Sequence, residues 1–459
     1  MAREYDAIII GTGQSGPSLA ARFDREGLKA AIIERHKVGG SCVNAGCIPT
    51  KTLVASARNA QMVRRAADYG IVVEGPVRAD MQQVKARMRK ISGQSREGLT
   101  AWLEGMDNTT LYRGHGQLAG PDSVRVGDEL LRAPKIFLNV GTRARVPTFP
   151  GIEEIDVLTS TGLLELEELP EHLVVVGGSY IGLEFAQMYR RFGSAVTVIE
   201  RGPRLIHHDD DDVSEAVREI LENEGVAMRL NADCIGFAEE DGRIAARVQC
   251  QDGPPEVLGS HLLLAVGRVP NTDDLGLDNA GIASDPRGFI PVDDQLRTEV
   301  EGIWAIGDCN GKGAFTHTSY NDYEIVAANL FDDDPRRVSD RILCYGLYID
   351  PPLGRVGMTE RQARASGRRV LVGKRPMTQV GRAKEFGETQ GFIKILVDAD
   401  SERILGAAIL GLSGDEVVHC LLDVMYADVP YTVISRAVHI HPTVTELVPT
   451  TLQSLRPLE

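Results

Sequence analysis

Several things are scarce in this sequence, and each scarcity excludes a class of protein. Positive charge is in deficit: 50 Lys and Arg stand against 65 Asp and Glu, and the formal net charge is −15. Most of the surface would therefore repel a nucleic acid or an anionic membrane. No apolar run reaches the roughly 18 to 20 residues that span a bilayer, and the chain opens on a strand-like run instead of a basic signal segment. We expect a cytoplasmic protein without nucleic-acid or membrane partners.

Cysteine is also sparse. The 7 cysteines are odd in number and mostly far apart, which does not describe the disulfide framework of a secreted domain. Hydrophobic residues make up 43% and charged residues 25% of the 459, and this ordinary globular composition excludes a disordered or collagenous chain. At roughly 100 to 200 residues per domain, the length predicts about three compact units.

The first 35 residues predict a βαβ unit of the kind that binds a dinucleotide. The strand-like run YDAIII leads into a glycine-rich turn, an apolar-periodic helix and a second strand, AAIIE, which ends at Glu34. In the turn, Gly11 allows the tight bend, Gly13 lets the backbone approach a pyrophosphate, and Gly16 permits close helix packing. The helix N-terminus attracts negative charge, and Glu34 would accept hydrogen bonds from a ribose. A glycine-rich turn without a ligand is the alternative interpretation.

The same unit recurs later in the chain. The strand LVVVG leads into a turn from Gly177 to Gly182, and a helix and the strand AVTVIE follow, ending at Glu200. Ser179 stands where the fingerprint has its middle glycine, which we expect to be tolerated. Two such units predict two dinucleotides, or a flavin and a nicotinamide, with electron transfer between them. The predicted fold class is α/β with two Rossmann-like domains.

The residues around Glu200 bear on the choice of nicotinamide coenzyme. A carboxylate accepts from a ribose 2′-hydroxyl and repels a 2′-phosphate, so Glu200 favours NADH. Arg201 and Arg204 follow closely and could accommodate the phosphate of NADPH. We expect NADH, and NADPH stays open.

Cys42 and Cys47 form the one closely spaced cysteine pair of the sequence. Five residues of regular helix rise about 7.5 Å, which exceeds the usual Cα separation of a disulfide. A bridge would need a distorted turn, for which Gly46 and Pro49 supply the means. Two buried structural cysteines are the simpler interpretation for a cytosolic protein. Next to a flavin-type βαβ unit, a catalytic dithiol is favoured.

Two segments make the chain resemble a known family. Residues 39–51 read GGSCVNAGCIPTK, and residues 298–308 read TEVEGIWAIGD. They are similar to the redox-active signature and the second FAD motif of the flavin-dependent pyridine nucleotide-disulfide oxidoreductases, and the resemblance covers essentially the whole chain. It implies FAD and NAD(P) domains and a C-terminal α+β dimerisation domain. The expected divisions are an FAD domain at 1–146, an NAD(P) domain at 147–268, a central segment completing the FAD domain at 269–338, and an interface domain at 339–459. In the interface domain we expect short strands (GFIKILVD, ILGAAIL) and a helix through residues 415–427.

The resemblance also implies roles for the matching residues. Cys42 would be the interchange thiol that meets the acceptor, and Cys47 the charge-transfer thiolate against the flavin. Lys51 would lie by the flavin ring and pair with Glu184. The remaining FAD contacts would be Glu34 at the ribose, Ser41 at the phosphates, Gly116 near the adenine, Asp308 at the ribitol and the Thr316 backbone at the ring.

The nicotinamide side has its own expected residues. By the resemblance, Tyr180 would cover that face of the flavin and swing away as the coenzyme enters, in a pocket lined by Gly267. Simple packing is the alternative for Tyr180. His317 and Cys309 flank the expected FAD site, where they could tune the substrate pocket or merely fill space.

The segment HIHPTVTE contains a candidate acid/base pair, His441 and Glu446. Its simple interpretation is a helix-start capping box of Thr443 with Glu446. Its functional interpretation takes His441 as the general acid/base toward a leaving thiol, oriented and kept basic by Glu446. The resemblance implies that the pair comes from the partner subunit, which makes the active form a homodimer. His439 is expected to pack nearby.

The charged run from His207 to Asp212 could look like a metal site. It opens an expected helix, where acidic residues are stabilised by the helix dipole and usually solvated, so we expect no metal there.

Within the family, the stretches STGLLELEELPEHL, FTHTSYNDYEIV and DPPLGRVGMTERQARASG are most similar to the mercuric-reductase-like branch close to the reactive-chlorine-resistance oxidoreductases. The expected acceptor is therefore a metal ion or a reactive oxidant. The C-terminal LQSLRPLE lacks the vicinal cysteine pair of mercuric reductases, so mercury itself is disfavoured. A small-molecule disulfide reductase of the dihydrolipoamide dehydrogenase or glutathione reductase type stays open, as does a non-catalytic redox-sensing flavoprotein.

Overall fold

A computed structural model describes residues 2–249 and 253–458. Its N-terminal part is built on a five-stranded parallel sheet with the strand order β19-β8-β2-β3-β4. The strands are β2 (Ala7–Ile10), β3 (Ala30–Glu34), β4 (Thr109–Arg113), β8 (Ile136–Leu138) and β19 (Ile303–Ala305).

Both faces of this sheet are covered, which explains why its inner strands β2, β3 and β8 read as nearly continuous apolar runs. Alternate residues face opposite sides: Ile9 and Ile32 pack on the helices α1 (Ser15–Arg25) and α9 (Thr316–Phe331), whereas Ile8 and Ile33 pack on a four-stranded sheet. That second sheet contains β1 (Arg3–Glu4), β5 (Gly116–Gly120), β6 (Ser123–Val126) and β7 (Glu129–Arg132).

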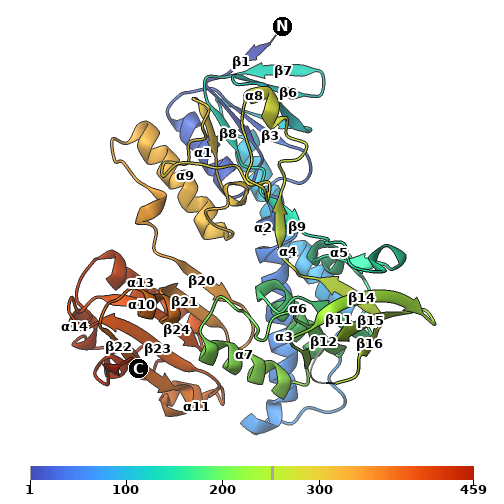
Figure 1. Ribbon diagram of the computed structural model, residues 1–459, viewed down its shortest axis with the longest axis vertical. Coiled ribbons are helices and arrows are strands. Elements are labelled where there is room, and N and C mark those ends of the chain that lie inside the picture. Colours follow the sequence, from blue (N-terminus) through green and yellow to red (C-terminus); the bar gives the residue numbers. More distant parts are fainter. Residues whose placement is uncertain (1, 250–252, 459) are drawn as a thin grey trace.

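The predicted second βαβ unit forms a separate five-stranded parallel sheet, seen at the lower right of Figure 1. The strand order is β10-β17-β11-β12-β13. One face carries α6 (Tyr180–Phe192) and α7 (Asp211–Asn223), and the other carries the antiparallel strands β14 (Asp233–Glu240), β15 (Arg243–Gln249) and β16 (Glu256–Gly259). The parallel strands are β10 (Val157–Leu158), β11 (His172–Val176), β12 (Ala195–Ile199), β13 (Ala227–Arg229) and β17 (His261–Leu264).

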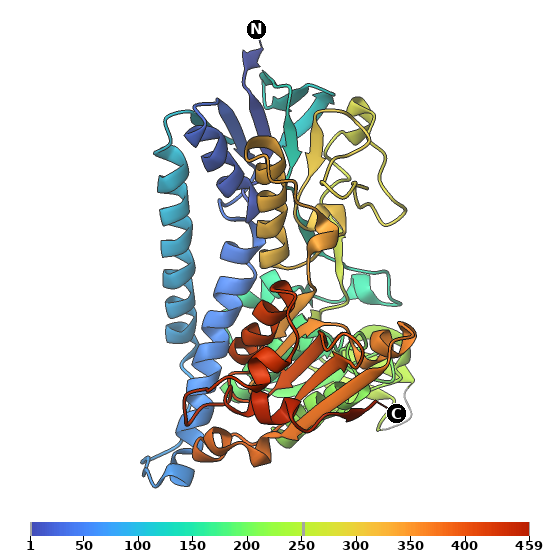
Figure 2. The same ribbon diagram turned by 90° about the vertical axis from the view of Figure 1, so that its left-hand side faces the viewer.

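Two long helices, α3 (Cys47–Arg64) and α4 (Met81–Glu104), run together from the upper to the lower half of the molecule, as Figure 2 shows. The short helix α2 (Gly40–Asn44) precedes them. Helix α3 packs on α6, so the helix that begins at Cys47 touches the second nucleotide-binding sheet. The connecting elements include β9 (Thr142–Ala144), α5 (Ser160–Glu165), β18 (Arg268–Pro270) and α8 (Leu277–Ala280).

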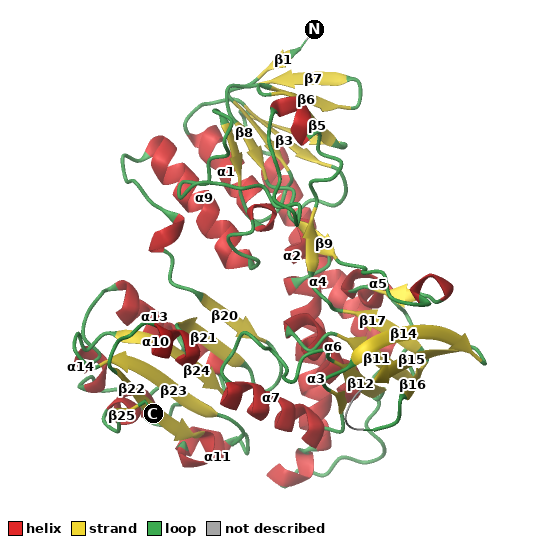
Figure 3. Cartoon of the chain, viewed as in Figure 1, coloured by secondary structure: helices red, strands yellow, loops and turns green. Residues whose placement is uncertain are grey.

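The C-terminal part is a six-stranded antiparallel sheet with the order β20-β21-β24-β23-β22-β25, flanked by short helices (Figure 3). The helix expected through residues 415–427 is divided at Val418 into two. No helix in the described ranges is long and apolar enough to cross a membrane. The strands are β20 (Cys344–Leu347), β21 (Leu353–Gly357), β22 (Val370–Pro376), β23 (Phe392–Asp398), β24 (Ile404–Leu410) and β25 (Arg456–Pro457), and the helices are α10 (Glu360–Ala365), α11 (Gly381–Glu385), α12 (Gly414–Val417), α13 (His419–Tyr426), α14 (Thr432–Ser435) and α15 (Leu447–Leu452).

The expectation that the acidic run before α7 is solvated is wrong for two of its residues. Asp209 and Asp210 are 2% and 6% exposed. They lie against the C-terminal sheet, where Arg355 of β21 and Lys394 of β23 are equally buried. The sequence pattern shows a charged helix start, but it does not show that a second domain packs over it.

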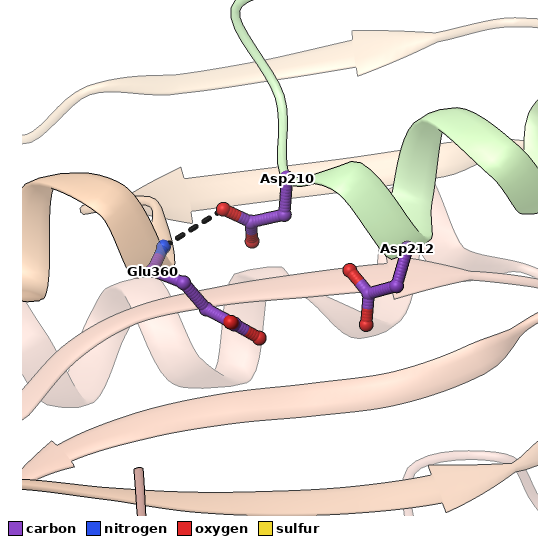
Figure 4. A group of neighbouring side chains, drawn as sticks. All are labelled: Asp210, Asp212 and Glu360. Carbon is purple, nitrogen blue, oxygen red and sulfur yellow. Dashed lines mark hydrogen bonds between the residues drawn. The ribbon is translucent and has the colours of Figure 1, made fainter. Parts of the chain in front are cut away.

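Asp210, Asp212 and Glu360 bring their carboxylates close together, as a metal site would (Figure 4). A cation from the chain already lies among them: the Lys394 ammonium is 2.8 Å from Asp210, 2.6 Å from Asp212 and 2.9 Å from Glu360. Burial alone would lower the pKa of Lys394, but the carboxylates outweigh it and raise that pKa, so the ammonium stays charged.

Replacing Lys394 by Met should therefore be strongly destabilising. The substitution keeps most of the side-chain volume but leaves buried carboxylates without their cation, which costs about 3 to 5 kcal/mol of unfolding free energy. Lys374→Met is the matched control, because Lys374 reaches the same Asp212 at 2.5 Å from a side chain that is 36% exposed. Denaturant unfolding of the FAD-loaded protein should show a clearly larger loss for Lys394→Met. Equal small losses would mean that the buried ammonium contributes no more than a surface lysine.

Candidate active site

One cavity of about 2100 Å³ runs between the two nucleotide-binding units. It is bounded by both glycine-rich turns, by the dithiol segment and by β20, so three parts of the fold contribute to its wall. Most of the residues selected from the sequence line it: Gly11, Gly13, Glu34, Ser41, Cys42, Cys47, Lys51, Gly116, Tyr180, Glu184, Gly267, Asp308 and Thr316.

The first turn has the close packing that a dinucleotide site requires. Gly11 has φ +108°, and a Cβ there would lie 2.2 Å from the Asn139 carbonyl oxygen. A Cβ on Gly16 would lie 2.4 Å from the Gly11 oxygen, so α1 can approach the turn only with glycine at that position. Together with the buried acid Glu34 at one end and the thiols at the other, the lining fits an FAD molecule.

Glu34 and Glu200 both hold their glycine-rich turns by accepting hydrogen bonds from backbone nitrogens. Glu34 Oε2 accepts from the Thr12 backbone nitrogen at 3.2 Å and from its hydroxyl, and Oε1 accepts from the His36 nitrogen at 2.8 Å. Glu200 accepts from the Gly178 nitrogen at 2.6 Å and the Gly202 nitrogen at 2.7 Å. Each acid therefore braces its own glycine-rich turn, and a ribose would use the remaining lone pairs.

The second turn repeats the tight geometry of the first. A Cβ on Gly177, which has φ +115°, would lie 2.4 Å from the Ala265 oxygen, and one on Gly182 would lie 2.1 Å from the Gly177 oxygen. Close by, Arg204 forms an ion pair with Asp211, the first residue of α7. Four residues selected from the sequence therefore shape the turns without lining the cavity: Gly16, Gly177, Gly182 and Glu200.

The two expected redox cysteines are free thiols at the centre of the cavity. Cys42 lies in α2, and Cys47 begins α3 after the irregular backbone of Gly46. A hydrogen bond from Cys42 lowers the pKa of Cys47 to about 6, and the Thr316 hydroxyl, 3.0 Å from its sulfur, acts in the same direction. The hydrogen bond to Cys47, together with burial, raises the pKa of Cys42. At neutral pH the pair is a thiolate at Cys47 beside a thiol at Cys42.

Lys51 lies one turn beyond Cys47 on α3 and forms an ion pair with Glu184 of α6, 2.6 Å away. The second oxygen of Glu184 accepts from the Tyr348 backbone nitrogen at 3.0 Å, and the Lys51 ammonium lies 4.5 Å from the Tyr348 ring. The positive charge of Lys51 contributes to the lowered pKa of Cys47.

Asp308 reaches the cavity from the segment after β19. It accepts from the Thr142 hydroxyl at 2.9 Å, and burial raises its pKa. Cys309 is fully buried, contacts the Leu138 and Ile306 carbonyls, and has its pKa raised by burial to about 12, so it fills space. His317 lines the cavity and bonds the Cys344 carbonyl oxygen at 2.8 Å.

Several lining residues gave no signal in the sequence. Tyr180 packs edge-on against Phe315 and Tyr345, with ring centroids 6.2 Å and 5.4 Å away, and Phe315 stacks on Tyr345. Tyr348 and Thr142 complete the polar and aromatic contacts. Sequence reasoning selected Tyr180 but not its neighbours, because a single aromatic residue or threonine carries no motif. The residues it missed are Thr142, Phe315, Tyr345 and Tyr348.

His441 and Glu446 are brought together but lie apart from this cavity. The His441 Nδ1 atom is 2.9 Å from Glu446 Oε2, and the His441 side chain is 79% exposed. Neither residue is in the cavity lining as described for this chain. The Thr443 hydroxyl accepts from the Glu446 backbone nitrogen at 3.2 Å, but α15 begins only at Leu447 and the Glu446 carboxylate pairs with His441. Only half of the expected capping box is therefore formed, and it precedes the helix.

Comparison with known proteins gives a consistent picture. The sequence model of pyridine nucleotide-disulphide oxidoreductases matches residues 5–322, and the model of their dimerisation domain matches residues 344–452. The probable pyridine nucleotide-disulfide oxidoreductase RclA of Escherichia coli is 36% identical over 451 residues, covering 96% of this chain and 97% of RclA. The dihydrolipoyl dehydrogenase of Chlorobaculum tepidum is 33% identical over 456 residues, covering 98% and 96%.

Solved structures agree with these sequence relatives. The Cu(II) complex of the HOCl-induced flavoprotein disulfide reductase RclA from Escherichia coli superposes with a TM-score of 0.90 at 34% identity and covers 99% of each chain. A second structure of the HOCl-induced flavoprotein disulfide reductase RclA from Escherichia coli gives a TM-score of 0.89 at 35% identity, covering 98% of this chain and 100% of that one.

The Thr316 hydroxyl should stabilise the Cys47 thiolate. Thr316→Val keeps the shape and removes the donor, so the pKa of Cys47 should rise by about one pH unit or more. The check is a pH titration of the thiolate-to-flavin charge-transfer absorbance in the two-electron-reduced protein. Thr52→Val is the control, because the Thr52 hydroxyl donates to the Ile48 carbonyl oxygen within α3. An unchanged titration in Thr316→Val would show that the hydroxyl does not support the thiolate.

Proposed function

The chain belongs to the pyridine nucleotide-disulphide oxidoreductase family, and on that premise we propose that it passes electrons from NADH through FAD and the Cys42–Cys47 dithiol to a metal ion or a reactive oxidant. The observation that carries the proposal is the dithiol itself. It lies where the two nucleotide-binding units share one cavity, with a thiolate-stabilising hydroxyl and an ammonium beside it.

Each cysteine of the dithiol would have a distinct role in electron transfer. Bound FAD would supply the carrier that links the two-electron nicotinamide to the dithiol. Cys47 holds negative charge toward the flavin position, since Thr316 and Lys51 both stabilise its thiolate. Cys42 keeps its proton until the acceptor arrives, and would then release it to solvent and make the first bond to the acceptor through its sulfur. Oxidation of the pair to a disulfide would release two electrons and this proton, and NADH, a hydride donor, would restore both.

NADH is the coenzyme that the second turn favours. A 2′-phosphate would approach the Glu200 carboxylate, which repels it. Of the two nearby cations that could offset this repulsion, Arg204 is engaged by Asp211. Arg201 is exposed, so NADPH stays the alternative coenzyme.

Two arguments support a metal ion or oxidant as acceptor. The chain is similar over its full length to RclA, which was solved as an HOCl-induced reductase and in a Cu(II) complex. A thiolate is also a soft ligand that suits copper. Each Cu(II) takes one electron, so one NADH would reduce two ions through the dithiol.

A disulfide acceptor is the second candidate, and the His441–Glu446 pair favours it. Reducing a disulfide transfers two electrons and two protons, because each departing thiolate must be protonated. A histidine held by a carboxylate suits that task, and its distance from the cavity of its own chain fits a homodimer in which each subunit completes the other's site.

An acceptor panel tests the proposal. NADH and NADPH oxidation by the FAD-bound dimer is followed with Cu(II), Hg(II), hypothiocyanite, glutathione disulfide and lipoamide. We expect turnover with Cu(II) or the oxidant, with NADH preferred.

Cys42→Ser should abolish this turnover while NADH still reduces the flavin. Cys420→Ser is the matched control, since that half-buried thiol contacts the Val417 carbonyl away from the cavity. Full turnover of every acceptor by Cys42→Ser would refute the dithiol route.

His441→Gln separates the two acceptor classes. Turnover of a disulfide should fall about 100-fold or more, as expected for loss of a general acid, whereas one-electron reduction of Cu(II) should change little because no leaving thiol needs a proton. Steady-state kcat is the measurement, and His439→Gln is the control two residues away. Equal losses with both acceptors would mean that His441 has a structural task.

A further inference from the structure

The loop between β12 and α7 joins the second glycine-rich turn to the C-terminal part of the fold. Near its start, the Ile206 backbone nitrogen donates to the Gly178 carbonyl oxygen at 2.8 Å, so the loop follows the turn closely. At its end, Asp210 accepts from the Glu360 backbone nitrogen at 2.8 Å, the contact drawn in Figure 4. Arg361 comes directly after Glu360 in α10, and these two contacts bring it near the turn.

Arg361 lines the large cavity together with the turn and the loop. Ser179 and Tyr180 line it where α6 begins, and His208 lines it from the loop. Gln362 lines it beside Arg361. A ligand that lies along the second turn is therefore faced by a cation from the C-terminal part.

The positive charge of Arg361 is left for a ligand. Its neighbour Glu360 pairs with Lys394 at 2.9 Å and with Arg364 at 3.7 Å. Arg361 itself is exposed, and it takes part in no ion pair within residues 2–249 and 253–458. An exposed guanidinium without a carboxylate can turn its planar set of donors toward phosphate oxygens, which it matches two at a time.

The ligand expected at this turn needs such a charge. A dinucleotide would place its pyrophosphate at the N-terminus of α6, and that helix end supplies only about half of one positive charge. Arg201 and Arg204 follow Glu200, which would bind the ribose, and neither is in the cavity lining of the described residues. Arg204 is also paired with Asp211. Of the three arginines, only Arg361 lines the cavity.

We propose that Arg361 is a coenzyme-binding residue whose guanidinium reaches over from the C-terminal part and binds the pyrophosphate of NADH at the second turn. This inference rests on the proposed function, in which NADH binds at that turn and reduces FAD. The coenzyme is then held between two parts of the fold and not by the nucleotide-binding unit alone. Its affinity depends on the contact between Asp210 and Glu360, because that contact places Arg361.

Arg361→Gln tests the assignment in the FAD-bound dimer. Isothermal titration calorimetry of the oxidised protein measures the Kd for NAD+ and for ADP-ribose, which contains the pyrophosphate but no nicotinamide. Both Kd values should rise about tenfold, as for loss of one hydrogen bond to a charged group. Arg364→Gln is the matched control, because Arg364 lies on the same helix and pairs with Glu360 but does not line the cavity. It should change either Kd by less than about twofold.

Three further measurements show whether the charge of Arg361 is the cause. Arg361→Lys keeps the charge without the planar fork, so it should recover part of the lost affinity. The difference between wild type and Arg361→Gln should shrink when NaCl is raised from about 0.05 M to about 0.5 M, because salt screens an exposed contact. In anaerobic stopped-flow experiments, the limiting rate of flavin reduction at saturating NADH should change by less than about twofold.

The outcomes separate this inference from the function on which it rests. Unchanged Kd values in Arg361→Gln, or equal losses in Arg364→Gln, would overturn the role of Arg361 while the proposed function stands. A loss confined to NADP+ would place Arg361 at the 2′-phosphate and overturn the assignment to the pyrophosphate. If neither NADH nor NADPH reduces the wild-type flavin, the proposed function fails and the inference fails with it.

Discussion

The ion pair between Lys51 and Glu184 is the contact on which the geometry of the site depends. Lys51 belongs to the helix that carries Cys47, Glu184 belongs to the helix that follows the second glycine-rich turn, and the same carboxylate accepts from the backbone of Tyr348. Three parts of the fold therefore meet at one buried acid. Removing Lys51 would leave the buried Glu184 carboxylate without its cation, so the pair holds these parts in one relative position.

Farther from the dithiol, buried ion pairs also hold separate parts of the fold together. A chain with a net charge of −15 has few cations to bury, yet Arg355 and Lys394 lie inside the contact between the C-terminal sheet and the start of α7. They neutralise acids that would otherwise be solvated at the end of a helix. In this docking contact, Asp210 pairs with both buried cations, so separating the two parts would leave buried charges without partners. Tyr345 and Asp209 connect that contact to the cavity.

The chemistry of the site follows from an asymmetry between two neighbouring thiols. Cys47 is surrounded by a hydroxyl, an ammonium and the proton of Cys42, all of which favour its thiolate, while Cys42 is left protonated. One sulfur is thereby suited to face an electron carrier, and the other to meet an acceptor. The His441–Glu446 pair does not contribute to the lining of this cavity, so the dithiol and the pair are separate features of the chain.

The sequence alone determined the duplicated βαβ units, their glycine-rich turns and the dithiol motif, because each depends on residues close together in the chain. Glycine is required where a Cβ would strike a carbonyl oxygen at 2.2 Å, and such local requirements leave a readable pattern. The strands β2 and β3 of the first sheet could likewise be predicted from their apolar runs. The division of the expected helix at 415–427 could not, since helix ends depend on the sheet beneath them.

The tertiary structure decided everything that depends on contacts between distant segments. It buried Asp209 and Asp210, which the sequence pattern placed in solvent, because Arg355 and Lys394 come from strands more than a hundred residues away and carry no motif. It brought Tyr345 and Phe315 against Tyr180, and Thr316 against Cys47. Whether a charged residue is buried and paired depends on the distant segment that packs over it. A short stretch of sequence contains the residue but not that segment.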